Sequence, residues 1–168
     1  MKKNSGYTLI ELVTVILIMG VLVAGASVSL KGMENADVDG AANKLVSILT
    51  QARSQSVTKA GGTIWFEIKC DGTGNLSAHI YQGDMTNPSA ATELDKISLC
   101  NKKISLVTKK ETPSGSIQQQ LNPGNSVKFQ FLKPSGELTE KYTDITLKGS
   151  KDVNIIVIYE TGRCIIEE

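Results

Sequence analysis

The chain has 168 residues and a formal net charge of +1 at pH 7. This length suggests one globular domain together with an apolar N-terminal segment. Apart from Lys2, Lys3 and Glu11, basic and acidic side chains are equal in number. The body of the chain therefore lacks the excess of positive charge that a general nucleic-acid-binding surface requires.

The apolar stretch over residues 7–30 contains one charged side chain, Glu11. About 24 helical residues span roughly 36 Å, which is enough to cross a bilayer. A carboxylate costs on the order of 2.5–3.5 kcal/mol at the bilayer centre, and a position near the start of the stretch lowers that cost. The Glu11 carboxylate is therefore expected to need an interaction partner. Lys2 and Lys3 favour a cytoplasmic leader, with residues 31–168 outside the cytoplasm.

Three interpretations of the N-terminal stretch compete. It is long enough for a plain membrane anchor, and the small residues at 24–26 are compatible with a secretory signal cut near Ala26. Neither interpretation needs Glu11 or the boundary between Gly6 and the aromatic Tyr7. The third interpretation rests on the run Gly6-Tyr7-Thr8-Leu9-Ile10-Glu11-Leu12. This run resembles the processing motif of type IV prepilins and type II secretion pseudopilins.

The resemblance implies a leader over residues 1–6 that a prepilin peptidase removes between Gly6 and Tyr7. Tyr7 would then become the N-methylated first residue, and residues 7–30 would stay as the membrane and filament-core helix. Glu11 falls on the family's glutamate and would meet the N-terminal amine of a neighbouring subunit, because opposite charges neutralise each other in a low-dielectric environment. The family's helix-melting proline is replaced by Val28.

The helix is predicted to continue through residues 31–60 as an amphipathic segment. Apolar residues recur there at helical spacing and predict a face packed on a sheet: they are Val38, Ala41, Ala42, Leu45, Ile48, Leu49 and Ala52. Gly61 and Gly62 predict the end of the helix near Ala60.

Residues 61–168 are predicted to form a β-rich head. Short strands are expected at 63–70, 76–82, 97–100, 103–107, 127–132, 145–147, 153–159 and 163–166, and loops at 84–91 and 111–125. A long helix followed by an antiparallel sheet is an α+β fold, which agrees with the pilin-like fold that the motif implies. Ala52-Arg53 late in the helix and the Gly162-Arg163 turn are similar to H-type minor pseudopilins and minor pilins.

Few residues of the head suggest chemistry. Cys70 and Cys100 are candidates for a disulfide because both end apolar strand-like segments, and three reduced thiols are the alternative. His79 is expected to be a half-exposed strand residue, and residues 71–75 a hairpin turn. Lysines at 102–103 and 109–110 predict a solvated sheet edge, with a small nucleic-acid contact as the alternative. No metal, cofactor or catalytic set is expected.

The sequence thus predicts a structural subunit and no enzyme. The expected partners are other pilin or pseudopilin subunits, a prepilin peptidase and an inner-membrane assembly platform. The expected location is a single-pass cytoplasmic membrane protein that later joins a cell-surface filament. The alternative is a tip or surface binding module for DNA uptake or adhesion carried by such a filament, although the balanced charge does not favour nucleic acid.

Overall fold

The computed structural model describes residues 8–59, 61–100 and 104–167, and the side chains of residues 24–36 are not described. The chain divides into two compact units, Met1–Glu34 and Asn35–Glu168. The helix α1 (Leu9–Thr58) contributes to both units. The head adds nine strands and a short 3₁₀ helix, η1 (Pro88–Ala90), within the described residues. The protein is an α+β protein, as the sequence predicts.

In the first unit, α1 exposes its apolar side chains all round. Leu9 is 82% exposed and Leu17 is 64% exposed, and the apolar residues between and after them as far as residue 23 are exposed as well. Within the described part of the chain, no helix combines the length and the apolar character needed to span a membrane. The membrane span predicted over residues 7–30 stays a prediction.

In the second unit, α1 buries one face and exposes the other. All seven residues of the predicted apolar stripe, from Val38 to Ala52, are at most 3% exposed, so the predicted face is confirmed. The helix ends at Thr58, and Gly61 and Gly62 follow with positive φ angles of 87° and 71°. The Lys133 ammonium donates to the carbonyl oxygens of Lys59 and Gly62 at 2.7 and 2.8 Å and thereby holds the end of the helix.

Sheet A is antiparallel with the strand order β3-β2-β1-β6. Its strands are β1 (Ile64–Cys70), β2 (Leu76–Gln82), β3 (Thr92–Cys100) and β6 (Ser126–Gln130). β2 has the bounds that the sequence predicts, whereas β3 begins five residues earlier than the predicted 97–100 strand. The early part of β3 is polar and mostly exposed, so it lacks the alternating apolar pattern that marks a strand.

Sheet B is antiparallel with the strand order β5-β4-β7-β8-β9. Its strands are β4 (Ser105–Thr112), β5 (Gly115–Gln120), β7 (Tyr142–Lys148), β8 (Asp152–Ile158) and β9 (Arg163–Ile166). The loop predicted over residues 111–125 is wrong, because β5 pairs with β4 there. Every residue of β5 is exposed, so backbone pairing alone forms this strand and no burial pattern signals it.

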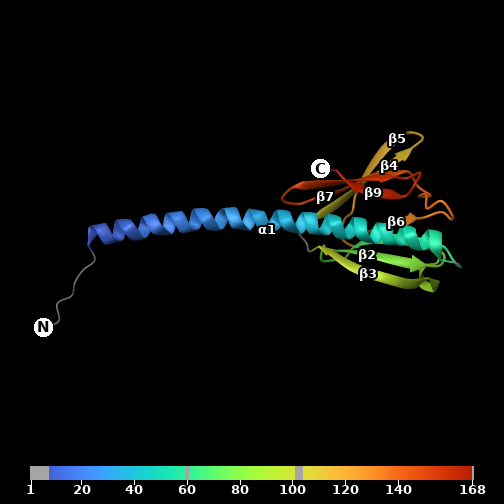
Figure 1. Cartoon of the computed structure of the whole chain (residues 1–168), viewed down its shortest axis with the longest axis horizontal. Coiled ribbons are helices and arrows are strands. Elements are labelled where there is room, and N and C mark those ends of the chain that lie inside the picture. The colour runs from blue at the N-terminus through green and yellow to red at the C-terminus, as the bar shows by residue number, and fades with distance from the viewer. Residues whose placement is uncertain (1–7, 60, 101–103, 168) are drawn as a thin grey trace. The chain divides into compact units, whose positions relative to one another are not determined.

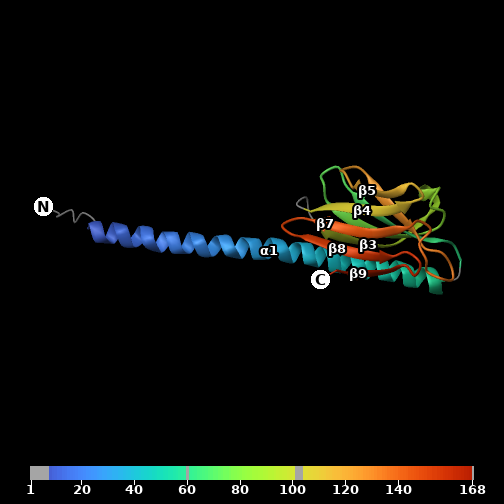
Figure 2. The ribbon, with the colours of Figure 1, turned by 90° about the horizontal axis from the view of Figure 1, so that it is seen from above.

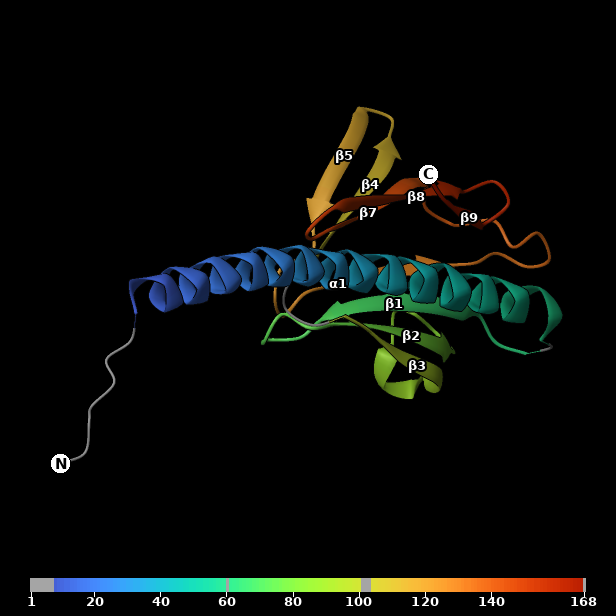
Figure 3. The same ribbon diagram turned by 60° about the vertical axis from the view of Figure 1, so that its left-hand side comes forward.

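One hydrophobic core joins the second half of α1 to both sheets. Figure 1 shows this half of the helix between β2 and β3 of sheet A and β7 and β9 of sheet B, and Figure 2, turned by 90°, shows most strands of both sheets on one side of it. Figure 3 shows β1 and β2 running along the helix. The core includes Leu45 and Leu49 of α1, Phe66 of β1, Phe129 of β6 and Ile155 of β8.

Two tight turns of the head meet at α1. The Arg53 side chain of the helix donates a hydrogen bond to the carbonyl oxygen of Thr161, between β8 and β9. Gly162 has a φ of +64°, and a Cβ at this position would lie 2.0 Å from the carbonyl oxygen of Gly136. Only glycine therefore fits this close approach. Arg53 and Gly162, noted in the sequence for their likeness to H-type pseudopilins, belong to one tertiary contact.

Candidate functional site

The processing motif is described from Thr8 onward, and Gly6 and Tyr7 lie outside the described residues. Thr8 and Glu11 form a reciprocal cap at the start of α1. The Glu11 carboxylate accepts hydrogen bonds from the Thr8 backbone N–H and from the Thr8 hydroxyl, both at 2.9 Å. The Glu11 backbone N–H donates to the Thr8 hydroxyl oxygen at 3.4 Å. This is a capping box, which satisfies two backbone donors that the helix leaves unpaired.

Sequence reasoning missed this cap, although its signal is present as Thr-x-x-Glu ahead of an apolar run. The cap gives the Glu11 carboxylate hydrogen-bond donors within its own chain. The predicted contact between Glu11 and a neighbouring subunit's amine stays a prediction, and it would have to compete with or add to these local bonds.

Sheet A has a second, polar and aromatic face opposite the core. Side chains alternate along β1, so Ile64, Phe66 and Ile68 enter the core and Trp65 lies on the other face. Trp65 stacks on Tyr81 of β2 with ring centroids 4.3 Å apart. The Tyr81 ring in turn stacks with the His79 ring at 5.9 Å.

His79 is buried on this face, which corrects the expectation of a half-exposed residue: its side chain is 7% exposed. Two partners bind its ring. Nδ1 lies 2.6 Å from Oε1 of Glu93 on β3, and Nε2 lies 2.9 Å from Oγ of Ser77 on β2. The spacing Ser77-x-His79 puts both side chains on one face of a strand. Glu93 was not predicted as a neighbour because the predicted strand began after it.

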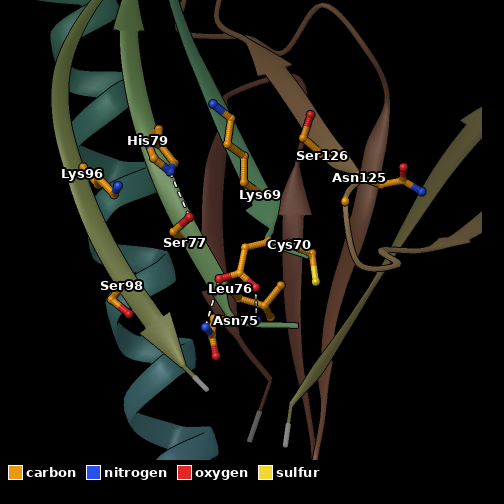
Figure 4. A pocket seen from close by; sticks show the side chains of 12 residues that line it. Lys69, Cys70, Asn75, Leu76, Ser77, His79, Lys96, Ser98, Asn125 and Ser126 are labelled. Carbon is orange, nitrogen blue, oxygen red and sulfur yellow. Dashed lines mark hydrogen bonds between the residues drawn. The ribbon is translucent and has the colours of Figure 1, made fainter. Parts of the chain in front are cut away.

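Ser77 and His79 line an open groove of about 680 Å³ beside the β1–β2 turn. Figure 4 shows the contact between Ser77 and His79, with Lys96 and Ser98 on the next strand. The other residues that line the groove include Lys69, Asn75, Asn125 and Ser126. Burial opposes the charge of Lys69, but contacts with Tyr81 at 3.0 Å and Glu67 at 3.1 Å outweigh it and raise the lysine pKa.

The turn between β1 and β2 is organised by Asp71, as expected of a hairpin. Its carboxylate accepts hydrogen bonds from the backbone and side chain of Thr73 and from the backbone and side chain of Asn75, at 2.7 to 2.9 Å. The Thr73 hydroxyl and the Asn75 N–H are the main causes that lower the Asp71 pKa to about 2. Within the described residues, no group of three or more His, Cys, Asp or Glu side chains could hold a metal ion.

The lysines considered as a nucleic-acid contact are not free cations where the structure describes them. Lys109 lies 3.5 Å from Asp144, and Lys110 lies 2.7 Å from Glu140. Their strand, β4, lies between β5 and β7, so the prediction that these two lysines protect a sheet edge is wrong. The lysines at 102–103 lie outside the described residues.

The three cysteines are present as free thiols. Cys70 and Cys100 both pair with Leu76, from opposite sides of β2, so one strand separates them. Two strand spacings are about 10 Å, whereas a disulfide needs Cα atoms within about 7 Å. The Cys70–Cys100 disulfide stays a prediction, and it would require the strands to move. Burial raises the pKa of Cys100 to about 11 and that of Cys164 to about 12, which keeps both thiols protonated and slow to react at neutral pH.

Comparison with known families finds a match at the N-terminus of the chain. The family described as the prokaryotic N-terminal methylation motif matches residues 1–27. A search of curated proteins and a search of solved structures each found no match. The chain thus carries, at residues 1–27, the N-terminal methylation signal of type IV prepilins and pseudopilins.

Proposed function

We propose that this protein is a subunit, and in particular a minor subunit, of a type IV pilus-like filament. A prepilin peptidase cuts it between Gly6 and Tyr7 and methylates Tyr7. The methylation motif at residues 1–27 is the observation that carries the proposal. The contact of Arg53 with the turn before Gly162 agrees with the minor-subunit part, because these residues carry the likeness to H-type pseudopilins.

The exposed apolar surface of α1 supports assembly through this helix. Residues 9–22 expose large apolar side chains in the single chain, although contiguous apolar surface is rarely left in water. A bilayer covers this surface before assembly, with the head outside the cytoplasm. Equivalent helices of neighbouring subunits cover it afterwards, when an assembly platform has moved the subunit into the filament. Apart from Glu11 and Thr14, the circumference of this segment is apolar, which suits both environments.

Glu11 has two roles in this proposal. Before assembly, its carboxylate is bonded to Thr8 of the same chain. In the filament, it pairs with the N-terminal amine of Tyr7 on an adjacent subunit. That amine exists only after cleavage, so the pairing admits only processed subunits. A charge buried among apolar helices is stable only with such a partner.

Substitution of Gly6 tests the proposed cleavage. A side chain at this position blocks close approach of the peptidase to the backbone, so Gly6→Ala should leave the protein at full length when a prepilin peptidase is co-expressed. Gly20→Ala is the matched control, because a Cβ at Gly20 meets nothing within 4 Å. Intact mass should show a processed control and an unprocessed Gly6→Ala protein. Removal of the leader from Gly6→Ala would contradict the proposed cleavage site.

A further inference from the structure

The hydrogen bonds of His79 define the direction in which protons can move. An ionised carboxylate only accepts hydrogen bonds, so the 2.6 Å contact with Glu93 places a proton on Nδ1 of His79. In the neutral ring, Nε2 then accepts, and the 2.9 Å contact makes the Ser77 hydroxyl its donor. A serine whose proton points to an imidazole, itself held by a carboxylate, is arranged for nucleophilic attack.

The surroundings of Ser77 suit a reaction with a bound molecule. Ser77 is partly exposed and lines the groove, whereas His79 is buried and held from both ring nitrogens. Strand register sets Ser98 opposite Ser77 and Lys96 opposite His79. The structure records no ion pair between the Lys96 ammonium and any described residue. Ser98 and Lys96 therefore supply a hydroxyl and a positive charge beside the nucleophile, which is where acyl transfer develops negative charge on oxygen.

We propose that Ser77 is a nucleophile that hydrolyses short-chain carboxylic esters of polar alcohols in this groove. Ser77 Oγ bonds to the ester carbonyl carbon and its proton moves to Nε2 of His79. The C–O bond to the alcohol breaks, and the alcohol leaves with that proton. Water then gives a proton to His79 and bonds to the acyl carbon. The bond between that carbon and Ser77 Oγ breaks, the carboxylic acid leaves, and His79 returns its proton to Ser77 Oγ. Glu93 is a positioning residue that acts through His79.

The lining of the groove sets the substrate class. Most residues that line it have polar side chains, and the exceptions are Cys70, Leu76 and Gly124. The groove is open and lined mainly by polar side chains, so a short acyl group on a polar, hydroxyl-rich alcohol fits best. This activity uses no residue of the N-terminal motif and is independent of the proposed filament role.

Active-site labelling of the full-length protein in detergent tests the proposal. A fluorophosphonate probe loses fluoride to an activated serine and stays bonded through phosphorus, so peptide mass spectrometry locates it. The probe should label Ser77, and hydrolysis of p-nitrophenyl acetate should be lost in Ser77→Ala. Ser116→Ala is the matched control, because Ser116 lies on the exposed strand β5 and does not line the groove. The control variant should keep both the labelling of Ser77 and the hydrolysis of p-nitrophenyl acetate.

A second pair of variants separates positioning from folding. Glu93 has a 45% exposed side chain, so its replacement should leave the fold intact. Glu93→Gln should slow labelling of Ser77 at least about tenfold, because loss of the carboxylate weakens the base assistance that His79 gives, which is worth about 10²–10⁴ in rate. Glu93→Asp should restore part of the labelling rate. Trp65 fluorescence should stay unchanged throughout. Absent labelling of Ser77, equal labelling of Ser98 or Ser126, or an unaffected rate in Glu93→Gln would each overturn the proposal.

Discussion

At the scale of single residues, acidic side chains fix the conformation of their own neighbourhoods. The Glu11 carboxylate caps the start of α1 by a hydrogen bond from Thr8. The Asp71 carboxylate holds the β1–β2 turn by hydrogen bonds from Thr73 and Asn75. Each is an exposed carboxylate that satisfies nearby backbone N–H groups. At Asp71 these bonds favour the ionised form over the protonated form, so the conformation of the β1–β2 turn depends on pH.

The turn at Asp71 should make stability depend on pH in the acid range. Its pKa of about 2 in the folded protein lies below the unfolded value of about 3.9. The folded state therefore gains stability from this group above about pH 4, and loses it as the pH falls toward 2. Chemical unfolding of wild type and Asp71→Asn, followed by Trp65 fluorescence, should give different midpoints at pH 6 that converge near pH 2. A difference that stays constant across this range would contradict the role given to the Asp71 carboxylate.

At the scale of elements, the head depends on how α1 meets the turns behind it. The buried stripe of α1 fills the core, and Arg53 reaches the β8–β9 turn at Thr161. Gly162 lets that turn approach the backbone of Gly136. These contacts join the helix to segments more than 80 residues away in the sequence, as the separation of 108 residues between Arg53 and Thr161 shows.

Gly162→Ala should destabilise the head by at least about 2 kcal/mol. The substitution adds strain at positive φ and forces a methyl group into the Gly136 carbonyl oxygen. Gly61→Ala is the matched control: its φ of +87° brings similar backbone strain, but a Cβ there meets nothing within 4 Å. Denaturant unfolding should show the larger loss for Gly162→Ala. Equal losses in the two variants would mean that the close approach to Gly136 adds nothing.

The sequence predicted those elements whose side chains alternate between core and solvent. The α1 stripe from Val38 to Ala52 and the strand β2 were found because burial imposes their spacing. β5 was missed because all its side chains are exposed and only backbone pairing forms it. The neighbours Ser77 and His79 share a strand face that the sequence shows, but Glu93 joins them only through the β2–β3 register, which no local pattern encodes.

At the scale of the whole molecule, the exposed apolar start of α1 differs from the head, which has a hydrophobic core of its own. The two have different needs. The large apolar side chains of residues 9–22 are exposed in the single chain, whereas the apolar stripe of residues 38–52 is buried in the core of the head. Glu11 lies at the start of the first segment, where it caps the helix and, in the proposed filament, pairs with the amine of a neighbouring subunit.

Glu11→Gln should separate capping from charge pairing. Glutamine can replace glutamate in a capping box, so cleavage and the start of α1 should be preserved, but the variant cannot neutralise a neighbour's amine. An uncompensated buried charge costs about 3–5 kcal/mol, and 1.4 kcal/mol is a factor of ten. Filament content, measured by immunoblot of sheared filaments, should therefore fall at least about tenfold. Thr8→Ala, which removes the hydroxyl cap and keeps the charge, should assemble better than Glu11→Gln. Better assembly of Glu11→Gln than of Thr8→Ala would mean that capping, and not charge pairing, controls the filament content.

The central claim is that this chain is a prepilin whose apolar helix stays in the mature protein. The most direct test is the mass of the mature N-terminal peptide from cells that express the protein with a prepilin peptidase. The account predicts a peptide that begins at Tyr7 and carries one methyl group on its amine. A peptide that begins at Met1, or at Ser27 after a secretory cut, would contradict it.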